Sequence, residues 1–146
     1  KARNDFSSFL GKKVAVLGLT FKPGTDDLRE APSIPNIRLL LNEGANVHAY
    51  DPVGIENFKK IYPTEIKYES TPAEALENAD LCLIFTEWEE IKNIDLKIFK
   101  NKMKTPYIYD GRNCFAIEDV QRSGINYHSI GRPEVKRCDT QQKELI

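Results

Sequence analysis

The stretch GLTFKPGTDDLREAPS (Gly18–Ser33) directly follows the apolar run VAVL (Val14–Leu17) and decides how the chain is organised. The apolar run is typical of a strand buried on both faces of a sheet. Beyond the stretch, apolar residues recur at helical spacing at Ile34, Ile37 and Leu40. The stretch itself is polar, with two prolines and two glycines, and can continue neither element. Open α/β sheets bind ligands in loops at the carboxyl ends of their strands, so we expect a binding site here.

Outward from this stretch, short apolar runs alternate with helical patterns. Further strands are expected at 46–50, 66–68, 81–85, 107–110 and 125–130, and helices at 33–43, 55–62, 72–78, within 88–102 and at 116–123. We expect Ser33 and Thr71 to cap the helices that follow them. Such alternation requires right-handed crossovers and a mostly parallel sheet. The sequence therefore predicts an α/β fold, a Rossmann-like three-layer α/β/α sandwich.

The domain organisation expected from the sequence is simple. Residues 1–12 form an incoming helical segment ending at Gly11, residues 13–132 form one α/β domain, and residues 133–146 form a polar, frayed tail. The first residue is not methionine, and we take the chain as a piece of a longer protein.

Composition and charge exclude several classes of protein. The 21 basic and 22 acidic residues give a net charge of −1, which provides no global field to attract nucleic acid or an anionic membrane. The three cysteines form no CxxC or Cys/His cluster, which favours a reducing compartment over a disulfide framework or a zinc site. With no membrane-spanning apolar run or signal pattern, we expect a cytoplasmic protein without nucleic-acid or membrane partners.

A dinucleotide site after the first strand is not supported by the sequence. GxGxxG is absent, because Phe21 and Lys22 occupy positions where bare backbone would approach a pyrophosphate. Asp51 lies about 33 residues after Gly18, whereas the acid that binds the ribose lies roughly 20 residues on. Since Pro52 follows, Asp51 has the pattern of a turn residue.

Candidate ligand contacts come from the ends of two strands. Lys22 could present its ammonium group to a phosphate, and Phe21 could pack over a base, although a solvated lysine and a loop-core phenylalanine explain them equally well. Arg112 follows the strand at 107–110 and therefore shares the carboxyl edge of the sheet with Lys22. Its planar guanidinium suits a phosphate or a base edge, with chance exposure as the alternative.

The acidic residues within Gly18–Ser33 permit a catalytic or a structural interpretation. Asp26, Asp27 and Glu30 could serve as general bases, or the first two could bind magnesium. Helix capping and ion pairs with Arg29 explain the same residues, and this loop-shaping role is favoured. We expect no metal.

The remaining reactive residue types give no nucleophile–base pair. His48 and His128 lie within strands, where structural histidines are usual. Cys82 lies in an apolar strand and should be inert, and Cys114 has no evident base to lower its pKa.

Four segments carry a resemblance to a known family. They are FKPGTDDLREAPS (Phe21–Ser33), AYDP (Ala49–Pro52), ALENADLCLIFTEW (Ala75–Trp88) and YDGRN (Tyr109–Asn113). The chain from about 11 to 132 thereby resembles the C-terminal domain of the UDP-glucose/GDP-mannose dehydrogenase family. The first segment is long and specific, whereas AYDP and YDGRN would be weak alone.

The resemblance implies a function. Enzymes of this family oxidise a nucleotide-sugar hydroxymethyl group to a carboxylate with two NAD+, which binds mainly to an N-terminal domain carrying most of the sugar-side machinery. Residues 13–132 would bind the UDP part of the substrate, with Phe21, Lys22 and Arg112 as contacts and Asp26, Asp27, Arg29 and Glu30 shaping the loop. The resemblance also implies an N-terminal dehydrogenase domain and a homo-oligomer as partners.

This sequence lacks the family's glycine fingerprint and its catalytic cysteine loop, so the fragment alone should be inactive. UDP-glucose is the favoured substrate. A UDP-N-acetyl sugar or GDP-mannose remains open, as does a receiver-like binding or signalling module in which Asp26, Asp27 and Asp51 form an acidic pocket.

Overall fold

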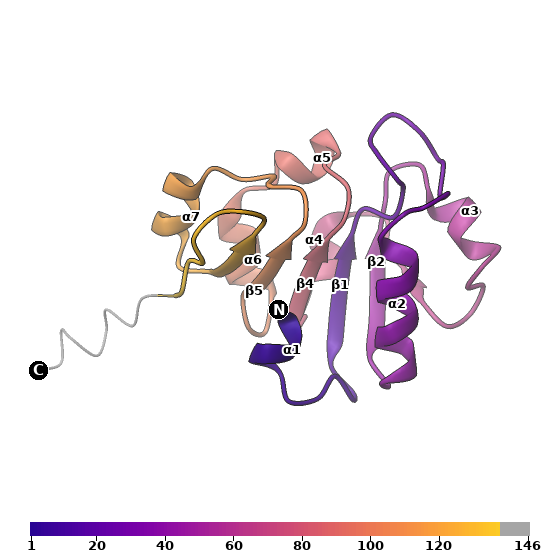
Figure 1. The fold of residues 1–146 in the computed structure, drawn as a ribbon, viewed down its shortest axis with the longest axis horizontal. Coiled ribbons are helices and arrows are strands. Elements are labelled where there is room, and N and C mark those ends of the chain that lie inside the picture. Colours follow the sequence, from indigo (N-terminus) through magenta and orange to yellow (C-terminus); the bar gives the residue numbers. More distant parts are fainter. Residues whose placement is uncertain (138–146) are drawn as a thin grey trace, which may run out of the picture.

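The computed structural model describes residues 1–137 and contains a six-stranded parallel sheet (Figure 1). Its strand order is β3-β2-β1-β4-β5-β6, and every neighbouring pair is parallel. The chain first adds strands on one side of β1 and then crosses to the other side at β4. The strands are β1 (Lys13–Leu17), β2 (Asn46–Tyr50), β3 (Lys67–Tyr68), β4 (Leu81–Ile84), β5 (Tyr107–Asp110) and β6 (Asn126–Ser129).

Helices cover both faces of the sheet and complete three layers. They are α1 (Ala2–Asp5), α2 (Ser33–Asn42), α3 (Ile55–Lys59), α4 (Pro72–Leu76), α5 (Glu89–Lys92), α6 (Leu96–Lys102) and α7 (Ile117–Ser123). Side chains of α2 and α3 pack with one face of the sheet, and side chains of α4 to α7 pack with the other. Figure 1 shows α2 in front of β1 and β2, with α4 and α6 behind the sheet. The predicted Rossmann-like α/β fold is confirmed.

The start of α2 differs from the prediction. Ser33 is the first residue of the helix and Pro32 stands at the N-cap. The buried Ser33 hydroxyl instead donates to the Leu19 carbonyl at 2.7 Å, which ties the helix to the loop after β1. The predicted cap of α4 is confirmed, since the Glu74 N–H donates to the Thr71 hydroxyl at 3.2 Å.

Both ends of the described chain also differ in detail. The helix expected up to Gly11 ends at Asp5, and Phe6 is already extended because Phe6 and Phe9 pack against the sheet. Residues 133–137, predicted as part of a frayed tail, continue the fold, since Val135 and Tyr127 exchange two backbone hydrogen bonds of 2.7 and 2.9 Å. Residues 138–146 lie outside the described part, and the division into domains stays a prediction.

Every helix among residues 1–137 is too short or too polar to span a membrane.

Candidate functional site

The loops after β1, β4 and β5 meet at the carboxyl edge of the sheet. The strand order reverses between β1 and β4, and ligands of open α/β sheets bind outside the strand ends at such a switch point. In Figure 1 the strands point toward this edge, where the long loop between β1 and α2 projects. The stretch Gly18–Ser33 therefore lies at the expected binding edge.

Asp51, directly after β2, is the buried centre of this edge. It is 2% exposed, and its carboxylate accepts hydrogen bonds of 2.7–3.2 Å from five donors. These donors are the backbone N–H groups of Leu19, Thr20, Val53 and Gly54, and the indole N–H of Trp88. The carboxylate thus acts as a turn residue, as predicted, and also joins the loops after β1, β2 and β4. Its reach across three loops was not predicted.

Close packing fixes the first residues of the loop after β1. Gly18 has a φ of +88°, and a Cβ at this position would lie 2.6 Å from the Thr86 side chain. The Thr86 hydroxyl donates to the Thr20 carbonyl at 2.6 Å, and the Thr20 hydroxyl donates to the Lys22 carbonyl at 3.1 Å. Gly18 therefore allows the loop to pack closely against Thr86, and Phe21 and Lys22 stand where the glycines of a dinucleotide loop would be, so the residues present do not fit NAD at this loop.

Arg112 joins the loop after β5 to the other two loops. Its Nε donates to the Phe85 carbonyl at 2.8 Å, and its Nη2 donates to the Phe21 carbonyl at 2.9 Å. Its Nη1 lies 3.7 Å from the Glu87 carboxylate. The sequence suggested that the guanidinium faces a phosphate or a base, whereas in the structure the guanidinium holds two backbone carbonyls. Arg112 and Phe21 do lie together, while the side chains of Phe21 and Lys22 are exposed.

Asp110 holds the backbone that carries Arg112. Its Oδ1 accepts from the Arg112 N–H at 2.8 Å, and its Oδ2 accepts from the Cys114 N–H at 2.6 Å and the Tyr127 hydroxyl at 2.5 Å. The carboxylate is 2% exposed. Sequence reasoning missed this residue as a support, although the YDGRN segment contains the signal of an aspartate before a glycine turn.

In the acidic part of the loop after β1, Asp27 and Arg29 form an ion pair. The Arg29 guanidinium donates to the Asp27 carboxylate at 2.8–3.2 Å, and the Arg29 N–H donates to Asp27 Oδ1 at 2.9 Å. These hydrogen bonds lower the pKa of Asp27 to about 2. Asp26 and Glu30 are exposed, and Glu30 has a φ of +58°. Among residues 1–137, no group of three His, Cys, Asp or Glu side chains is arranged to hold a metal ion.

The cysteines and histidines of the described chain lie in structural settings. Burial raises the pKa of the Cys82 thiol well above its ordinary value, and burial beside Asp110 also raises that of Cys114. Neither thiol is therefore prepared as a nucleophile at neutral pH. His48 Nδ1 lies 2.9 Å from Glu69, and His128 Nε2 lies within 3.2 Å of two carboxylates. Cys138 lies outside the described residues.

Comparisons with known proteins agree with this geometry. The chain is 41% identical over 135 residues to the UDP-glucose 6-dehydrogenase YwqF of Bacillus subtilis, covering 92% of this chain and 31% of that protein. Among solved structures, it superposes on a UDP-glucose dehydrogenase from the archaeon Pyrobaculum islandicum with a TM-score of 0.71 at 28% identity, covering 86% of this chain and 27% of that one. It also superposes on the UDP-D-ManNAc dehydrogenase from Pyrococcus horikoshii with a TM-score of 0.68 at 28% identity, covering 90% and 28%.

The family assignment rests on most of the domain. The chain spans about 30% of the length of the curated relatives it matches. Residues 15–117 match the UDP-binding domain of the UDP-glucose/GDP-mannose dehydrogenase family, and this range contains all three loops of the candidate site. The chain therefore belongs to the UDP-glucose/GDP-mannose dehydrogenase family.

Proposed function

We propose that this chain binds the UDP part of a nucleotide sugar, as the UDP-binding domain of an NAD-dependent UDP-glucose 6-dehydrogenase. The observation that carries the proposal is the meeting of the β1, β4 and β5 loops at the switch point, where Arg112 fixes the backbone of Phe21 next to the exposed Lys22. An ammonium group on a fixed loop suits one or two phosphates, because charge-assisted hydrogen bonds to phosphate are strong. A UDP group presents such phosphates.

In this proposal the residues have separate roles. Lys22 contacts the pyrophosphate and Phe21 packs against the nucleotide sugar. Arg112 contributes positive charge at the nucleotide end while its hydrogen bonds hold the loop in place. Asp27 and Arg29 shape the loop, with Asp26 and Glu30 at its surface.

NAD+ is expected mainly on an N-terminal domain of the full-length protein, since the loop after β1 in this chain lacks the GxGxxG glycines of a dinucleotide site. The residues of the chemical step are also expected on that part. The full-length protein is also proposed to form a homo-oligomer and to work in the cytoplasm.

The sugar is the least constrained part of the substrate. UDP-glucose is proposed because YwqF, one of the curated relatives, is a UDP-glucose 6-dehydrogenase, whereas one similar structure is a UDP-D-ManNAc dehydrogenase. Turnover of the full-length protein with UDP-glucose, UDP-N-acetylmannosamine and GDP-mannose distinguishes these substrates. A receiver-like module is disfavoured, because the Asp51 carboxylate is buried and already accepts five hydrogen bonds.

Isothermal titration of the full-length protein with UDP tests the binding role of Lys22. Lys22→Ala should weaken UDP binding by about 1–3 kcal/mol, the range for losing a charged hydrogen bond. Lys97→Ala on α6 removes another exposed lysine and should leave the Kd unchanged. Equal UDP affinity in the Lys22→Ala variant and the parent protein would remove Lys22 from the site.

A further inference from the structure

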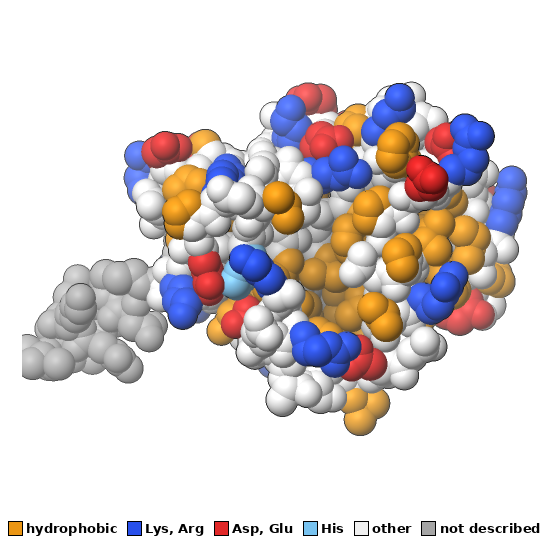
Figure 2. All heavy atoms as spheres, viewed as in Figure 1, with side chains coloured by type: hydrophobic (Ala, Val, Ile, Leu, Met, Phe, Trp, Pro, Cys, Tyr) orange, Lys and Arg blue, Asp and Glu red, His pale blue; other side chains and the backbone are white. Residues whose placement is uncertain are grey.

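Glu87, in the loop after β4, is the acid that lies against the guanidinium of Arg112. One oxygen of its carboxylate lies 3.7 Å from Nη1 of Arg112, which makes an ion pair but is too long for a hydrogen bond. The Glu87 and Arg112 side chains are 33% and 27% exposed, so salt and water screen this pair less than a fully exposed one. Figure 2 shows basic and acidic side chains interspersed along this edge of the molecule. The positive charge of Arg112 is therefore partly offset within the site itself.

The backbone on both sides of Glu87 is fixed by hydrogen bonds. The Thr86 hydroxyl donates to the Thr20 carbonyl at 2.6 Å, and the Trp88 indole N–H donates to the Asp51 carboxylate at 3.1 Å. Because Thr86 and Trp88 are the chain neighbours of Glu87, the carboxylate of Glu87 is attached to a backbone with little freedom to move. Its negative charge is therefore kept at the site.

Arg112 does not need Glu87 to hold its position. Its Nε and Nη2 already donate to the Phe85 and Phe21 carbonyls at 2.8 and 2.9 Å. Backbone carbonyls carry no net charge, so these two hydrogen bonds orient the guanidinium and leave its positive charge in place. The carboxylate of Glu87, by contrast, supplies a charge without a hydrogen bond. The contribution of Glu87 to the site is therefore electrostatic.

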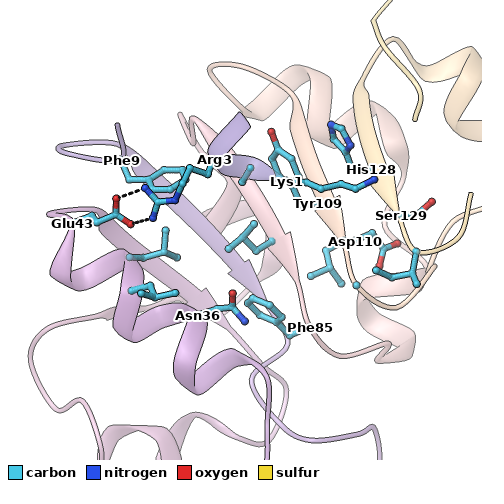
Figure 3. A pocket seen from close by; sticks show the side chains of 17 residues that line it. Lys1, Arg3, Phe9, Asn36, Glu43, Phe85, Tyr109, Asp110, His128 and Ser129 are labelled. Carbon is cyan, nitrogen blue, oxygen red and sulfur yellow. Dashed lines mark hydrogen bonds and ion pairs between the residues drawn. The ribbon is translucent and has the colours of Figure 1, made fainter. Parts of the chain in front are cut away.

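The charged groups of the site lie outside an apolar pocket of the same molecule. This pocket has a volume of about 380 Å³, and its lining includes Phe85 and Asp110 but not Lys22, Glu87 or Arg112 (Figure 3). The Lys22 side chain is exposed. A ligand that meets these three charged groups is therefore bound by surface loops, where charge distinguishes one phosphate compound from another more than enclosure does.

We propose that Glu87 selects nucleotide sugars over nucleoside triphosphates by limiting the positive charge of the site. This inference rests on the proposed function, in which Lys22 and Arg112 face the phosphates of UDP. A UDP-sugar carries about two negative charges and UTP about four at neutral pH, because a terminal phosphate group ionises with a second pKa near 6. The Glu87 carboxylate repels both ligands. Since Coulomb energy is proportional to charge, it disfavours UTP about twice as much in free energy.

Equilibrium binding to the full-length protein separates this role from a structural one. The Kd values of UDP-glucose and UTP are measured by isothermal titration with EDTA present, so that no metal ion neutralises the phosphates. The third phosphate of UTP is smaller than the glucose it replaces and should fit. Glu87→Gln removes the charge and keeps the size of the side chain, whereas Glu87→Asp keeps the charge. Glu77→Gln is the control, because the exposed Glu77 lies beside Lys13 at the start of β1, at the opposite edge of the sheet.

We expect Glu87→Gln to tighten UDP-glucose binding about three-fold and UTP binding about ten-fold, since doubling the charge of the ligand squares the factor. Glu87→Asp should keep the parent's ratio of the two Kd values, and Glu77→Gln should change each Kd less than about two-fold. Equal factors for the two ligands in Glu87→Gln, including no change, or weaker binding of both, would overturn the proposal. A parent protein that binds neither ligand would instead refute the proposed function, and this inference with it.

Discussion

Two buried aspartates at strand ends support the candidate site in different ways. Asp51 and Asp110 each follow a tyrosine at the carboxyl end of a strand, and each is 2% exposed. Asp51 binds donors from three loops, including the indole of Trp88, which lies 37 residues away. Asp110 binds the backbone of its own loop and the hydroxyl of Tyr127 on β6.

The difference shows that the same Tyr-Asp pair at a strand end can bind partners that are far away in the sequence or close to it. Asp51 follows β2, the neighbour of β1, and its carboxylate binds the N–H groups of Leu19 and Thr20, so it determines how the loop bearing Lys22 leaves β1. Asp110 ends β5, the neighbour of β4 on the other side of the switch point, and orients the turn that carries Arg112. Arg112 then connects the two regions through the Phe21 and Phe85 carbonyls. The site therefore depends on a long-range support and a local one.

The largest effect is expected from Asp51→Ala. This change leaves up to five N–H donors without their acceptor, and an unmet buried donor costs about 1–3 kcal/mol. Partial relaxation should bring the total loss in free energy of unfolding to about 3–5 kcal/mol. Urea denaturation measures it, with the exposed Asp26→Ala as the control that should change stability by less than about 0.5 kcal/mol. A loss of similar size in both variants would refute the role of Asp51 as a long-range support.

A smaller effect is expected from Asp110→Asn. The asparagine oxygen can still accept from the Arg112 N–H, while its amide group replaces the oxygen that faces Cys114 and Tyr127. We expect a loss of about 1–3 kcal/mol in the free energy of unfolding. In a double-mutant cycle with Tyr127→Phe, the two losses should be strongly non-additive, because both changes remove the same 2.5 Å hydrogen bond. Additive losses would show that the carboxylate supports only its own loop.

The smallest effect is expected at the partly buried Asp27, a third aspartate of the same edge. Its pKa is lowered by Arg29 from 3.8 to about 2. Because the folded pKa is depressed, its contribution to loop order is present above the unfolded value and is lost as the pH falls from about 4 to about 2. NMR titration of the Asp27 carboxyl should follow this window, and Arg29→Gln should return the midpoint toward 3.8. A midpoint near 3.8 with Arg29 intact would contradict the ion pair.

The distance between partners along the chain explains what could be predicted from the sequence. The strands were predictable because runs such as VAVL and LCLI are apolar on both faces, and the Asp27–Arg29 pair joins residues two positions apart. The carbonyls that hold the guanidinium of Arg112 lie 27 and 91 positions away, so no local pattern reveals them. Ser33 has the sequence of a helix cap, yet its hydroxyl binds Leu19, 14 positions earlier, because the tertiary contact competes with the local one.

Amide chemical-shift mapping of the 146-residue chain with UDP tests most directly the claim that the meeting strand-end loops form the nucleotide site. The method detects weak binding and reports its position. We expect UDP to shift amides within 19–22, 85–88 and 111–113, and equimolar NAD+ to leave them in place. Shifts confined to residues outside these three loops, or none at the loops at saturating UDP, would contradict the account.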